Sequence, residues 1–214
     1  KFIKKNRFNS KIIKIKKNSI KTKLNYIKNK LFLTQGNIQN LSFVFAIIKK
    51  LNLNAKKTLN TINNFKGLKF RQEIIFKAKN LTIINDSKAT SFSSSENILK
   101  SLKNVYWILG GIPKKGDKFQ MTRKECNSFK AYIFGNNKSF FIKNLRNKLA
   151  IQNFKNLKSA LKKVINDIRL SKSTINHKTI LFSPSAASFD SFRNFEDRGE
   201  NFNRLVQKLN LRKI

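Results

Sequence analysis

The stretch that decides the fold is Leu81-Thr82-Ile83-Ile84-Asn85-Asp86-Ser87-Lys88-Ala89-Thr90, an apolar run that ends in polar residues. A helical pattern follows over Ser93–Leu102. Short apolar runs between amphipathic helices are typical of parallel strands covered on both faces. The candidate strands are Glu73–Ala78, Leu81–Asn85, Val105–Leu109, Ala131–Phe134 and Thr179–Phe182, and further candidate helices are Lys138–Leu149, Leu157–Leu170 and Phe189–Leu211. We therefore expect an α/β fold with a mostly parallel sheet flanked by helices over residues 68–214.

The first 67 residues have a different pattern. Residues 1–33 alternate loosely, which predicts short strands joined by polar turns, with apolar or β-branched residues at Ile13, Ile15, Ile20, Thr22 and Leu24. Helices are predicted over Leu41–Leu51 and Ala55–Phe65, and Gly67 ends the second one. The buried face of the first helix is predicted to hold Leu41, Val44, Phe45, Ile48 and Leu51. Residues 1–67 are thus expected to form a small α+β unit.

The composition is strongly basic. The 214 residues include 47 Lys and Arg but only 10 Asp and Glu, which gives a net charge of +37. A charge of this size is typical of nucleic-acid-binding proteins. However, the excess residues are Lys, Asn, Ile and Phe, which A/T-rich codons encode, and lysine occurs in nearly every block of ten. Compositional drift is the favoured interpretation, with non-specific nucleic-acid binding at most, and a nucleic-acid-binding protein remains the alternative.

Other features bear on the compartment. A single cysteine, Cys126, rules out an internal disulfide framework, and no apolar run is long enough for a transmembrane helix. The start lacks both an apolar signal region and an initiator Met. We expect a cytoplasmic protein without a membrane partner, and a chain that is a fragment.

Three polar segments each directly follow a predicted strand: Asn85–Thr90, Gly110–Asp117 and Ser183–Gly199. Ligands of open parallel sheets bind at the carboxyl ends of the strands, so we predict that the three segments meet at one edge. The alternatives are an N-cap and turn for the first segment and an ordinary Gly/Pro loop for the second. In the third, a helix is expected to begin near Phe189 or Asp190, where free N–H groups would suit a carboxylate.

The acidic residues point to the same segments. No acid precedes Glu73, and six of the ten lie in or beside the three segments: Glu73, Asp86, Asp117, Asp190, Glu196 and Asp197. Carboxylates retained in so basic a chain are expected to serve a ligand site.

Several chemistries are excluded or disfavoured. No Gly precedes a Lys, so the phosphate loop G-x-x-x-x-G-K-[ST] is absent. The only histidine, His177, lies at the other end of the strand that precedes Ser183, which argues against a Ser-His hydrolase. His177 is interpreted as a surface residue and Cys126 as an inert helix residue, and no residue is predicted to bind a metal.

The order of the motifs resembles the Mur ligase family. The resemblance rests on Asn85–Thr90, on Gly110-Gly111 with Lys114, and on the long block Ser183–Gly199. Leu68–Glu73 is similar to the family's Leu-x-His-Arg-x-Glu junction, and Asn37–Asn40 to the end of its Gly-x-His-Asn-x-x-Asn motif. The match runs from about Leu31 to the C-terminus. The departures are Phe70 and Gly36 in place of His, Thr34 in place of Gly, and Ser185-Ala186 in place of Ala-Cys.

The resemblance implies that residues 68–214 are the Rossmann-like C-terminal domain, which binds glutamate, and that residues 1–67 are a remnant of the central ATPase domain. The implied reaction activates the terminal carboxylate of UDP-N-acetylmuramoyl-L-alanine with ATP as an acyl phosphate, which the amine of D-glutamate then attacks to form an amide. ATP and Mg²⁺ are the implied cofactors, with the magnesium ligands mostly outside this chain, and the implied oligomeric state is a monomer. A different amide ligase of the superfamily, such as a folylpolyglutamate synthetase, is the second alternative, and the Ser183–Gly199 block argues against it.

The resemblance also implies residue roles. Lys88 is expected to be catalytic, beside the transferred phosphate. The residues expected to bind ATP are Asn37, Asn40, Arg71 and Asp86. The residues expected to bind D-glutamate are Thr90, Lys114, Ser188, Phe189 and Phe195, the phenylalanines through backbone and packing. Without a phosphate loop, the 214 residues alone are expected to be inactive.

Overall fold

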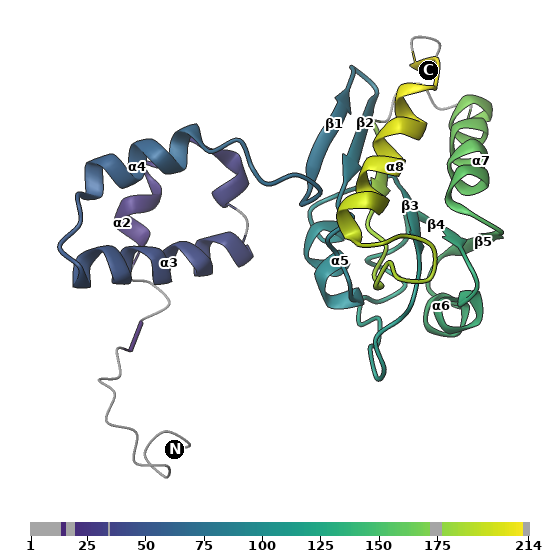
Figure 1. Ribbon diagram of the computed structural model, residues 1–214, viewed down its shortest axis with the longest axis horizontal. Helices are drawn as coiled ribbons and strands as arrows, with labels where there is room; N and C mark the ends of the chain where they lie inside the picture. Colours follow the sequence, from purple (N-terminus) through teal and green to yellow (C-terminus); the bar gives the residue numbers. More distant parts are fainter. Residues whose placement is uncertain (1–13, 16–19, 34, 172–176, 212–214) are drawn as a thin grey trace. The chain divides into compact units, whose positions relative to one another are not determined.

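A computed structural model describes residues 14–15, 20–33, 35–171 and 177–211. The chain divides into two compact units, residues 1–67 and 68–214 (Figure 1). Each unit has a hydrophobic core of its own.

The regular elements described in unit 1 are helices: α2 (Lys21–Leu24), the 3₁₀ helix η1 (Lys30–Leu33), α3 (Gln35–Lys50) and α4 (Ala55–Asn64). Asn54 caps α4 by accepting a hydrogen bond from the N–H of Lys57 at 3.0 Å. The core of unit 1 is small and consists of Ile20, Ile27, Leu41, Phe45, Ile48 and Ile62, with Leu24, Phe32, Ile38 and Leu59 packed against it.

Three predictions for unit 1 are wrong. The strand predicted through Ile20, Thr22 and Leu24 is helical, because Ile20 and Ile27 are buried against α3 and α4 and short alternation does not distinguish a strand from a helical turn. Ile15 lies in no regular element, while Ile13 and Thr34 lie outside the described residues. Helix α3 also begins six residues earlier than expected. Its predicted core positions Val44 and Leu51 are exposed, at 40% and 61%.

Unit 2 contains a six-stranded sheet in the order β1-β2-β6-β3-β4-β5. The strands are β1 (Glu73–Lys77), β2 (Leu81–Asn85), β3 (Val105–Gly110), β4 (Phe129–Phe134), β5 (Ala150–Phe154) and β6 (Lys178–Phe182). Every neighbouring pair is parallel except β1 and β2. The predicted α/β class with a mostly parallel sheet is confirmed. The edge strand β5 was not predicted, because Gln152 and Asn153 interrupt its apolar pattern.

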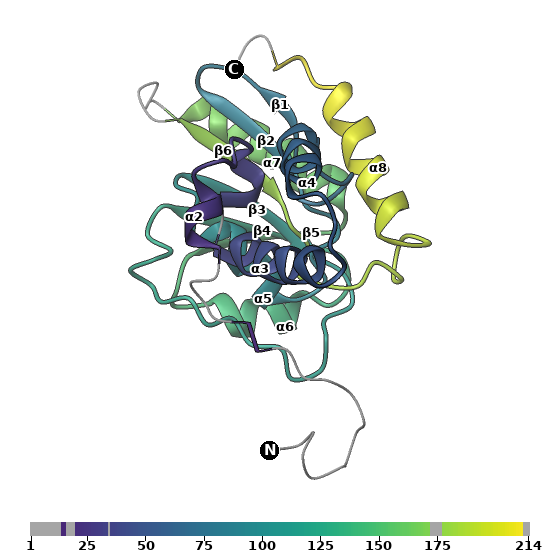
Figure 2. The same cartoon turned by 90° about the vertical axis from the view of Figure 1, so that its left-hand side faces the viewer.

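Helices cover both faces of this sheet. Helices α5 (Phe92–Leu99) and α6 (Lys138–Leu145) pack on one face, and α7 (Leu157–Leu170) and α8 (Phe195–Gln207) pack on the other (Figures 1 and 2). Successive side chains of β3 point to opposite faces of the sheet and so contribute to two hydrophobic cores. Trp107 and Leu109 belong to the first core, on the side of α5 and α6, and Tyr106 and Ile108 belong to the second core, on the side of α7 and α8. The prediction for α7 is confirmed to the residue. Helices α5 and α6 end three and four residues earlier than expected.

Helix α8 begins later than predicted. It starts at Phe195, not near Phe189 or Asp190, because the side chain of Asn194 accepts a hydrogen bond from the N–H of Asp197 at 2.8 Å. The preceding segment turns back on itself, since the carbonyl of Ser188 accepts from the N–H groups of Ser191 and Phe192. Cys126 is also placed differently: it is buried in a turn region between β3 and β4, not in a helix.

The N-cap of α8 gives a first prediction. The substitution Asn194→Ala should lower the free energy of unfolding of unit 2 by about 1 kcal/mol, because the side-chain cap is lost. The substitution Asn194→Asp should retain the cap. Denaturant unfolding followed by the fluorescence of Trp107, the single tryptophan and fully buried, measures both variants. Equal losses in the two variants would contradict a side-chain cap at this position.

Candidate functional site at the carboxyl edge of the sheet

The three predicted segments meet at the carboxyl edge of the sheet. Strand β6 lies between β2 and β3, so the loops after all three strands emerge side by side. The N–H of Asp86 donates to the carbonyl of Phe182 at 2.7 Å, which joins the loops after β2 and β6. Ile112 and Ala187 exchange two hydrogen bonds of 2.9 Å, which join the loops after β3 and β6. The prediction of one shared edge is therefore confirmed.

Asp86 is buried beneath this edge, with 5% of its surface exposed. Its two carboxyl oxygens accept from the N–H of Gln72 at 3.1 Å and from the hydroxyl of Ser183 at 2.9 Å. Burial raises the pKa of the carboxyl group from its ordinary value of 3.8 to about 6, although both hydrogen bonds and the charge of Arg71 oppose the rise. Arg71 itself is exposed. The position predicted to bind ribose is thus a carboxyl group set deep in the fold.

A chain of buried hydroxyl groups extends from Asp86. The hydroxyl of Ser183 lies 2.7 Å from that of Ser95, which in turn lies 2.6 Å from that of Ser185. Ser185, which stands in place of the family's Ala, has a φ of 57°. Ser95 comes from α5 and was not predicted as part of the site, because a serine within a helix gives no sequence signal of such a role.

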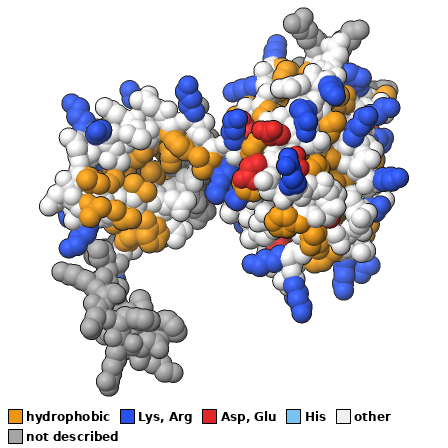
Figure 3. Space-filling model, in the orientation of Figure 1, with side chains coloured by type: hydrophobic (Ala, Val, Ile, Leu, Met, Phe, Trp, Pro, Cys, Tyr) orange, Lys and Arg blue, Asp and Glu red, His pale blue; other side chains and the backbone are white. Residues whose placement is uncertain are grey.

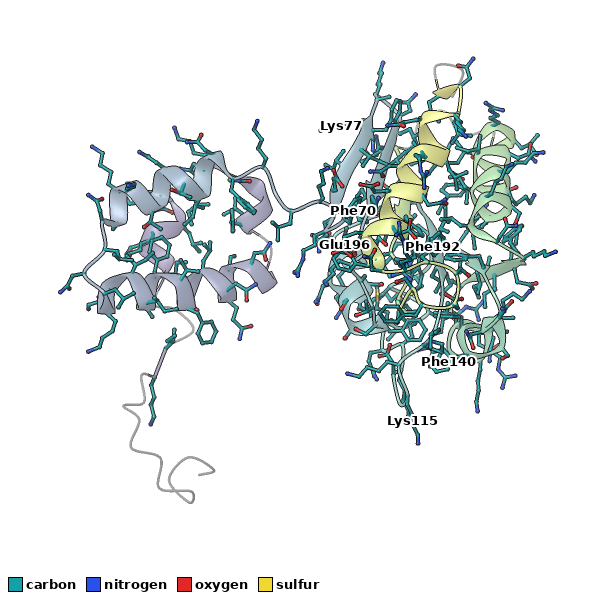
Figure 4. All side chains as sticks on the ribbon, viewed as in Figure 1. Phe70, Lys77, Lys115, Phe140, Phe192 and Glu196 are labelled. Carbon is teal, nitrogen blue, oxygen red and sulfur yellow. The ribbon has the colours of Figure 1, made fainter. Side chains whose placement is uncertain are left out.

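The junction segment Leu68–Glu73 is held tightly against this edge. Phe70 and Gln72 have φ angles of 61° and 50°, a region that side chains seldom adopt. The N–H of Phe70 donates to Glu73 at 2.9 Å, and its carbonyl accepts from the N–H of Lys88 at 3.0 Å. The ring of Phe70 packs against Gly199 in α8, where a Cβ atom would overlap it, close to Glu196 (Figure 4). Phe70 therefore fills a packing position.

Lys88 rests on an aromatic ring. Its Nζ lies 3.6 Å from the centroid of the Phe195 ring, at the start of α8. In residues 14–15, 20–33, 35–171 and 177–211, the ion pair found is that of Lys163 with Asp167. The charge of Lys88 is therefore held in place without neutralisation by one of the described carboxylates.

Asp117 links the segment that carries Thr90 to the segment that carries Lys114. Its carboxylate accepts from the N–H of Phe92 at 2.6 Å, two residues after Thr90, and its N–H donates to the carbonyl of Lys114 at 3.1 Å. The loop after β3 is thereby fastened to the first turn of α5. The side chains of Thr90 and Lys114 are both exposed at this edge.

Ser188 and Phe189 differ in exposure. Ser188 is buried and lies one residue beyond the Ile112–Ala187 bridge, which places it opposite Gly111 in the antiparallel register. Phe189 is 72% exposed. The predicted residues of unit 2 thus gather at one edge. Asn37 and Asn40 lie in unit 1 on α3, where the Asn40 amide is 3.5 Å from the side-chain oxygen of Asn37.

Most of the six singled-out carboxylates bind the backbone. Glu73, Asp86, Asp117 and Asp197 each accept a hydrogen bond from a main-chain N–H group. Asp190 is different, because its Oδ2 is buried and has no hydrogen-bond partner among the described residues. Burial raises the pKa of Asp190, and the charge of Arg198 opposes the rise. The structure therefore gives most of these acids a role in loop geometry.

Other predicted features lie away from this edge. His177 is exposed and contacts the hydroxyl of Thr82 at 2.8 Å at the opposite end of the strands. Burial raises the pKa of the Cys126 thiol to about 11. Within the described part of the chain, no group of three His, Cys, Asp or Glu residues is arranged to hold a metal ion, and no helix has the length and apolarity needed to cross a membrane.

The fold and the three loops define an α/β domain with a candidate ligand-binding edge, and the sequence of the chain is similar to part of UDP-N-acetylmuramoylalanine–D-glutamate ligases. The chain is 37% identical over 174 residues to a UDP-N-acetylmuramoylalanine–D-glutamate ligase of Wolbachia sp. subsp. Brugia malayi, which covers 81% of the chain and 34% of that ligase. It is 35% identical over 197 residues to the ligase of that name from Rickettsia felis, covering 91% of the chain and 42% of the ligase. No protein-family model matches.

The particular match is thus to part of a D-glutamate-adding Mur ligase. The ligase of the same name from Prochlorococcus marinus strain MIT 9312 is 36% identical over 179 residues. The chain spans 34% to 42% of the length of these relatives.

Asp86 gives a prediction for the pH dependence of stability. Because its pKa is raised on folding, its favourable contribution is complete below pH 4 and is lost as the pH rises through 6. Asp86→Asn removes the titration and keeps one acceptor oxygen for the N–H of Gln72, while its amide group can donate to the Ser183 hydroxyl in place of accepting from it. The free energy of unfolding of the native chain should fall relative to this variant by about 3 kcal/mol between pH 4 and pH 7.5. Denaturant unfolding at several pH values tests this, and a constant difference would contradict it.

Gly111 gives a prediction with a matched control. A Cβ atom there would overlap the carbonyl of Ala187 and approach Nη1 of Arg198 at 3.1 Å. Gly116 also has a positive φ, but nothing lies within 4 Å of a Cβ atom there. Gly111→Ala should lower the free energy of unfolding by about 3 kcal/mol or more, and Gly116→Ala by about 1 kcal/mol. Equal losses in chemical denaturation would show that the close approach at Gly111 is unimportant.

Proposed function

We propose that this chain forms part of an ATP-dependent ligase that joins D-glutamate to UDP-N-acetylmuramoyl-L-alanine through an acyl phosphate. The observation that carries the proposal is the convergence of Lys88, Thr90, Lys114 and Ser188 at the carboxyl edge of one parallel sheet, in a chain similar to ligases of that name. Such an edge is where open α/β sheets bind ligands. Peptidoglycan precursor synthesis in the cytoplasm is the corresponding process.

The proposed domain organisation assigns residues 68–214 to the glutamate-binding domain and residues 1–67 to a remnant of the central ATPase domain. The surface of unit 1 supports this assignment. Phe43 and Ile47 on α3 and Leu51 directly after it are spaced four residues apart, and their side chains are 51%, 56% and 61% exposed. An apolar stripe of this kind is typical of a surface that further protein covers. The chain spans between 34% and 43% of the length of such relatives, so more than half of each relative has no counterpart in this chain.

The residues after β2 are proposed to bind the nucleotide. A lysine without a carboxylate partner suits a phosphate, and an exposed guanidinium suits a phosphate or a base face, so Lys88 and Arg71 fit this donor set. Asp86 is proposed to accept a ribose hydroxyl. Asn37 and Asn40, which belong to unit 1, are proposed to bind ATP on the strength of the resemblance. Bound ATP would supply the phosphoryl group that makes the substrate carboxylate a good electrophile. Among the described residues, no group of three His, Cys, Asp or Glu residues is arranged to hold a magnesium ion.

The residues around the Ile112–Ala187 bridge are proposed to bind D-glutamate. The exposed ammonium group of Lys114 and the hydroxyl groups of Thr90 and Ser188 are donors suited to its two carboxylates. Phe189 and Phe195 contribute backbone groups and packing. Holding the amine beside an activated carboxylate is the main task of this edge, because positioning supplies on the order of 7–11 kcal/mol of a barrier.

The nucleic-acid alternative is not favoured. It requires a continuous positive stripe, yet the Lys and Arg side chains are scattered over the visible face of unit 2, where acidic side chains also gather (Figure 3). Similarity to D-glutamate ligases likewise favours that activity over a folylpolyglutamate synthetase. A monomer that binds nucleic acid only non-specifically is the proposed state.

The activity itself gives a prediction. The 214 residues alone should not hydrolyse ATP, since no phosphate loop is present. A chimera that joins the upstream part of the Wolbachia ligase to Leu31 and the residues after it should release phosphate only when D-glutamate is added. Lys114→Ala should lower that release at least tenfold, about 1.4 kcal/mol, because a carboxylate loses its cation.

Two controls make this assay specific. Lys115→Ala removes a neighbouring exposed charge from the same loop and should leave phosphate release within about twofold. Ser188→Ala should impair the reaction, whereas Ser191→Ala, on the exposed side of the same turn, should not. Equal effects of Lys114→Ala and Lys115→Ala would refute the assignment of Lys114, and turnover by the 214 residues alone would refute the domain assignment.

A further inference from the structure

Arg198 lies in the first turn of α8 and is fully buried, with 0% of its surface exposed. Its Nε donates to the hydroxyl of Ser87 at 3.1 Å, and its Nη2 donates to the carbonyls of Ser87 at 2.8 Å and Ala186 at 2.9 Å. A single guanidinium group thus joins the loop after β2 to the loop after β6. These two loops carry Lys88 and Ser188.

The loop after β3 closes on the same group. A Cβ atom at Gly111 would lie 3.1 Å from Nη1 of Arg198, so the absence of a side chain there makes room for the guanidinium. Ser87 adds a second link, because its hydroxyl donates to the carbonyl of Phe195 at 2.8 Å. Phe195 is the residue whose ring supports Lys88. All three loops of the edge, and the start of α8, therefore meet at Arg198.

Burying the charged guanidinium group of Arg198 costs free energy. Burial lowers the pKa of Arg198 to about 10, so the group stays charged at neutral pH without water around it. Its Nη1 has no hydrogen-bond partner among the described residues, and no carboxylate of the described chain lies within 4 Å of it. Carbonyl oxygens, rather than an ion pair, therefore hold the guanidinium in place. Only the planar fork of arginine reaches two carbonyls and a hydroxyl at once, and lysine does not reproduce that geometry.

We infer that Arg198 is a positioning residue for the proposed ligase site: it fixes the loops after β2, β3 and β6 relative to one another and so sets the separation of Lys88, Lys114 and Ser188. The inference rests on the proposed function. Because Arg198 is fully buried, it acts through the loops and does not touch substrate. A displacement of reacting groups by about 1 Å lowers a rate on the order of a hundredfold, so a fixed separation matters at such a site.

The test compares three variants of the full chain with the native protein. Arg198→Lys keeps the charge and removes the fork. Ser87→Ala removes one of the three hydrogen bonds made by Arg198. Leu161→Ala is the stability control, because Leu161 is buried in α7 among the second core and is not part of the three loops. Fluorescence of Trp107 measures the stability of each variant.

Two readouts are taken. The first is amide hydrogen exchange of Lys88, Ala89, Ile112 and Ala187, whose N–H groups hold the loops in the ligand-free chain. The second is the dissociation constant for D-glutamate, measured by titration calorimetry. Arg198→Lys should speed exchange at these amides and weaken D-glutamate binding, each by about tenfold or more, while amides within β3 and β4 stay protected. Ser87→Ala should give a smaller change of the same kind. Leu161→Ala should leave the dissociation constant within about twofold despite its lower stability.

The outcomes separate the inference from the proposed function. If the native chain does not bind D-glutamate, the proposed function is contradicted, and the exchange readout still decides whether Arg198 fixes the loops. If Arg198→Lys leaves loop exchange and affinity as in the native chain, or if Leu161→Ala weakens binding as much, the positioning role is refuted. If Arg198→Lys does not fold, Ser87→Ala decides by the same two readouts.

Discussion

The pairing of β6 with both β2 and β3 is the constraint on which the site depends. Strand β6 comes from residues 178–182, yet it lies between strands that end at Asn85 and Gly110. Three loops that are distant along the chain are thereby brought to one edge. Because parallel pairing of this kind closes long loops, the site exists only when almost all of residues 68–214 are folded.

The interactions around that edge explain how so basic a chain arranges its charges. The scarce carboxylates mostly accept hydrogen bonds from main-chain N–H groups, so they shape loops and leave the nearby cations without ion-pair partners. The three cations of this edge have different surroundings. Arg198 is buried against carbonyls, Lys88 rests on the Phe195 ring, and Lys114 is exposed. Cations that are not paired with carboxylates suit anionic ligands, which is what an ATP-dependent ligase for glutamate requires.

Much of unit 2 could be predicted from sequence because its signals are local. The run Leu81–Asn85 and the amphipathic pattern of Leu157–Leu170 match the observed elements to the residue. The signals that failed were weak or ambiguous. The helix was predicted to begin near Phe189 or Asp190, but Asn194 supplies the side-chain cap, so α8 begins after it at Phe195. The half-polar strand β5 and the helical turns around Ile20 are stabilised by tertiary packing, which local patterns do not report.

The site was predictable only in part for a related reason. Residues in motifs, such as Lys88 and Lys114, could be singled out because they directly follow strands. The hydroxyl chain through Ser95 joins residues 88 to 90 positions apart, and Arg198 lies 111 positions from Ser87, which it contacts. Nothing in the local sequence indicates such partners. The function of Asp117 as a tie between two loops was likewise visible only once Phe92 and Lys114 were placed beside it.

The central claim is that the carboxyl edge of this sheet binds D-glutamate. The most direct measurement is a crystal structure of the full chain grown with D-glutamate, with a second crystal grown with L-glutamate as the control. The account predicts D-glutamate at the loops after β2, β3 and β6, with its carboxylates within hydrogen-bond distance of Lys114 and of the Thr90 or Ser188 hydroxyl, and no such density for L-glutamate. D-glutamate bound at the opposite edge of the sheet, or absent from the three loops, would contradict it.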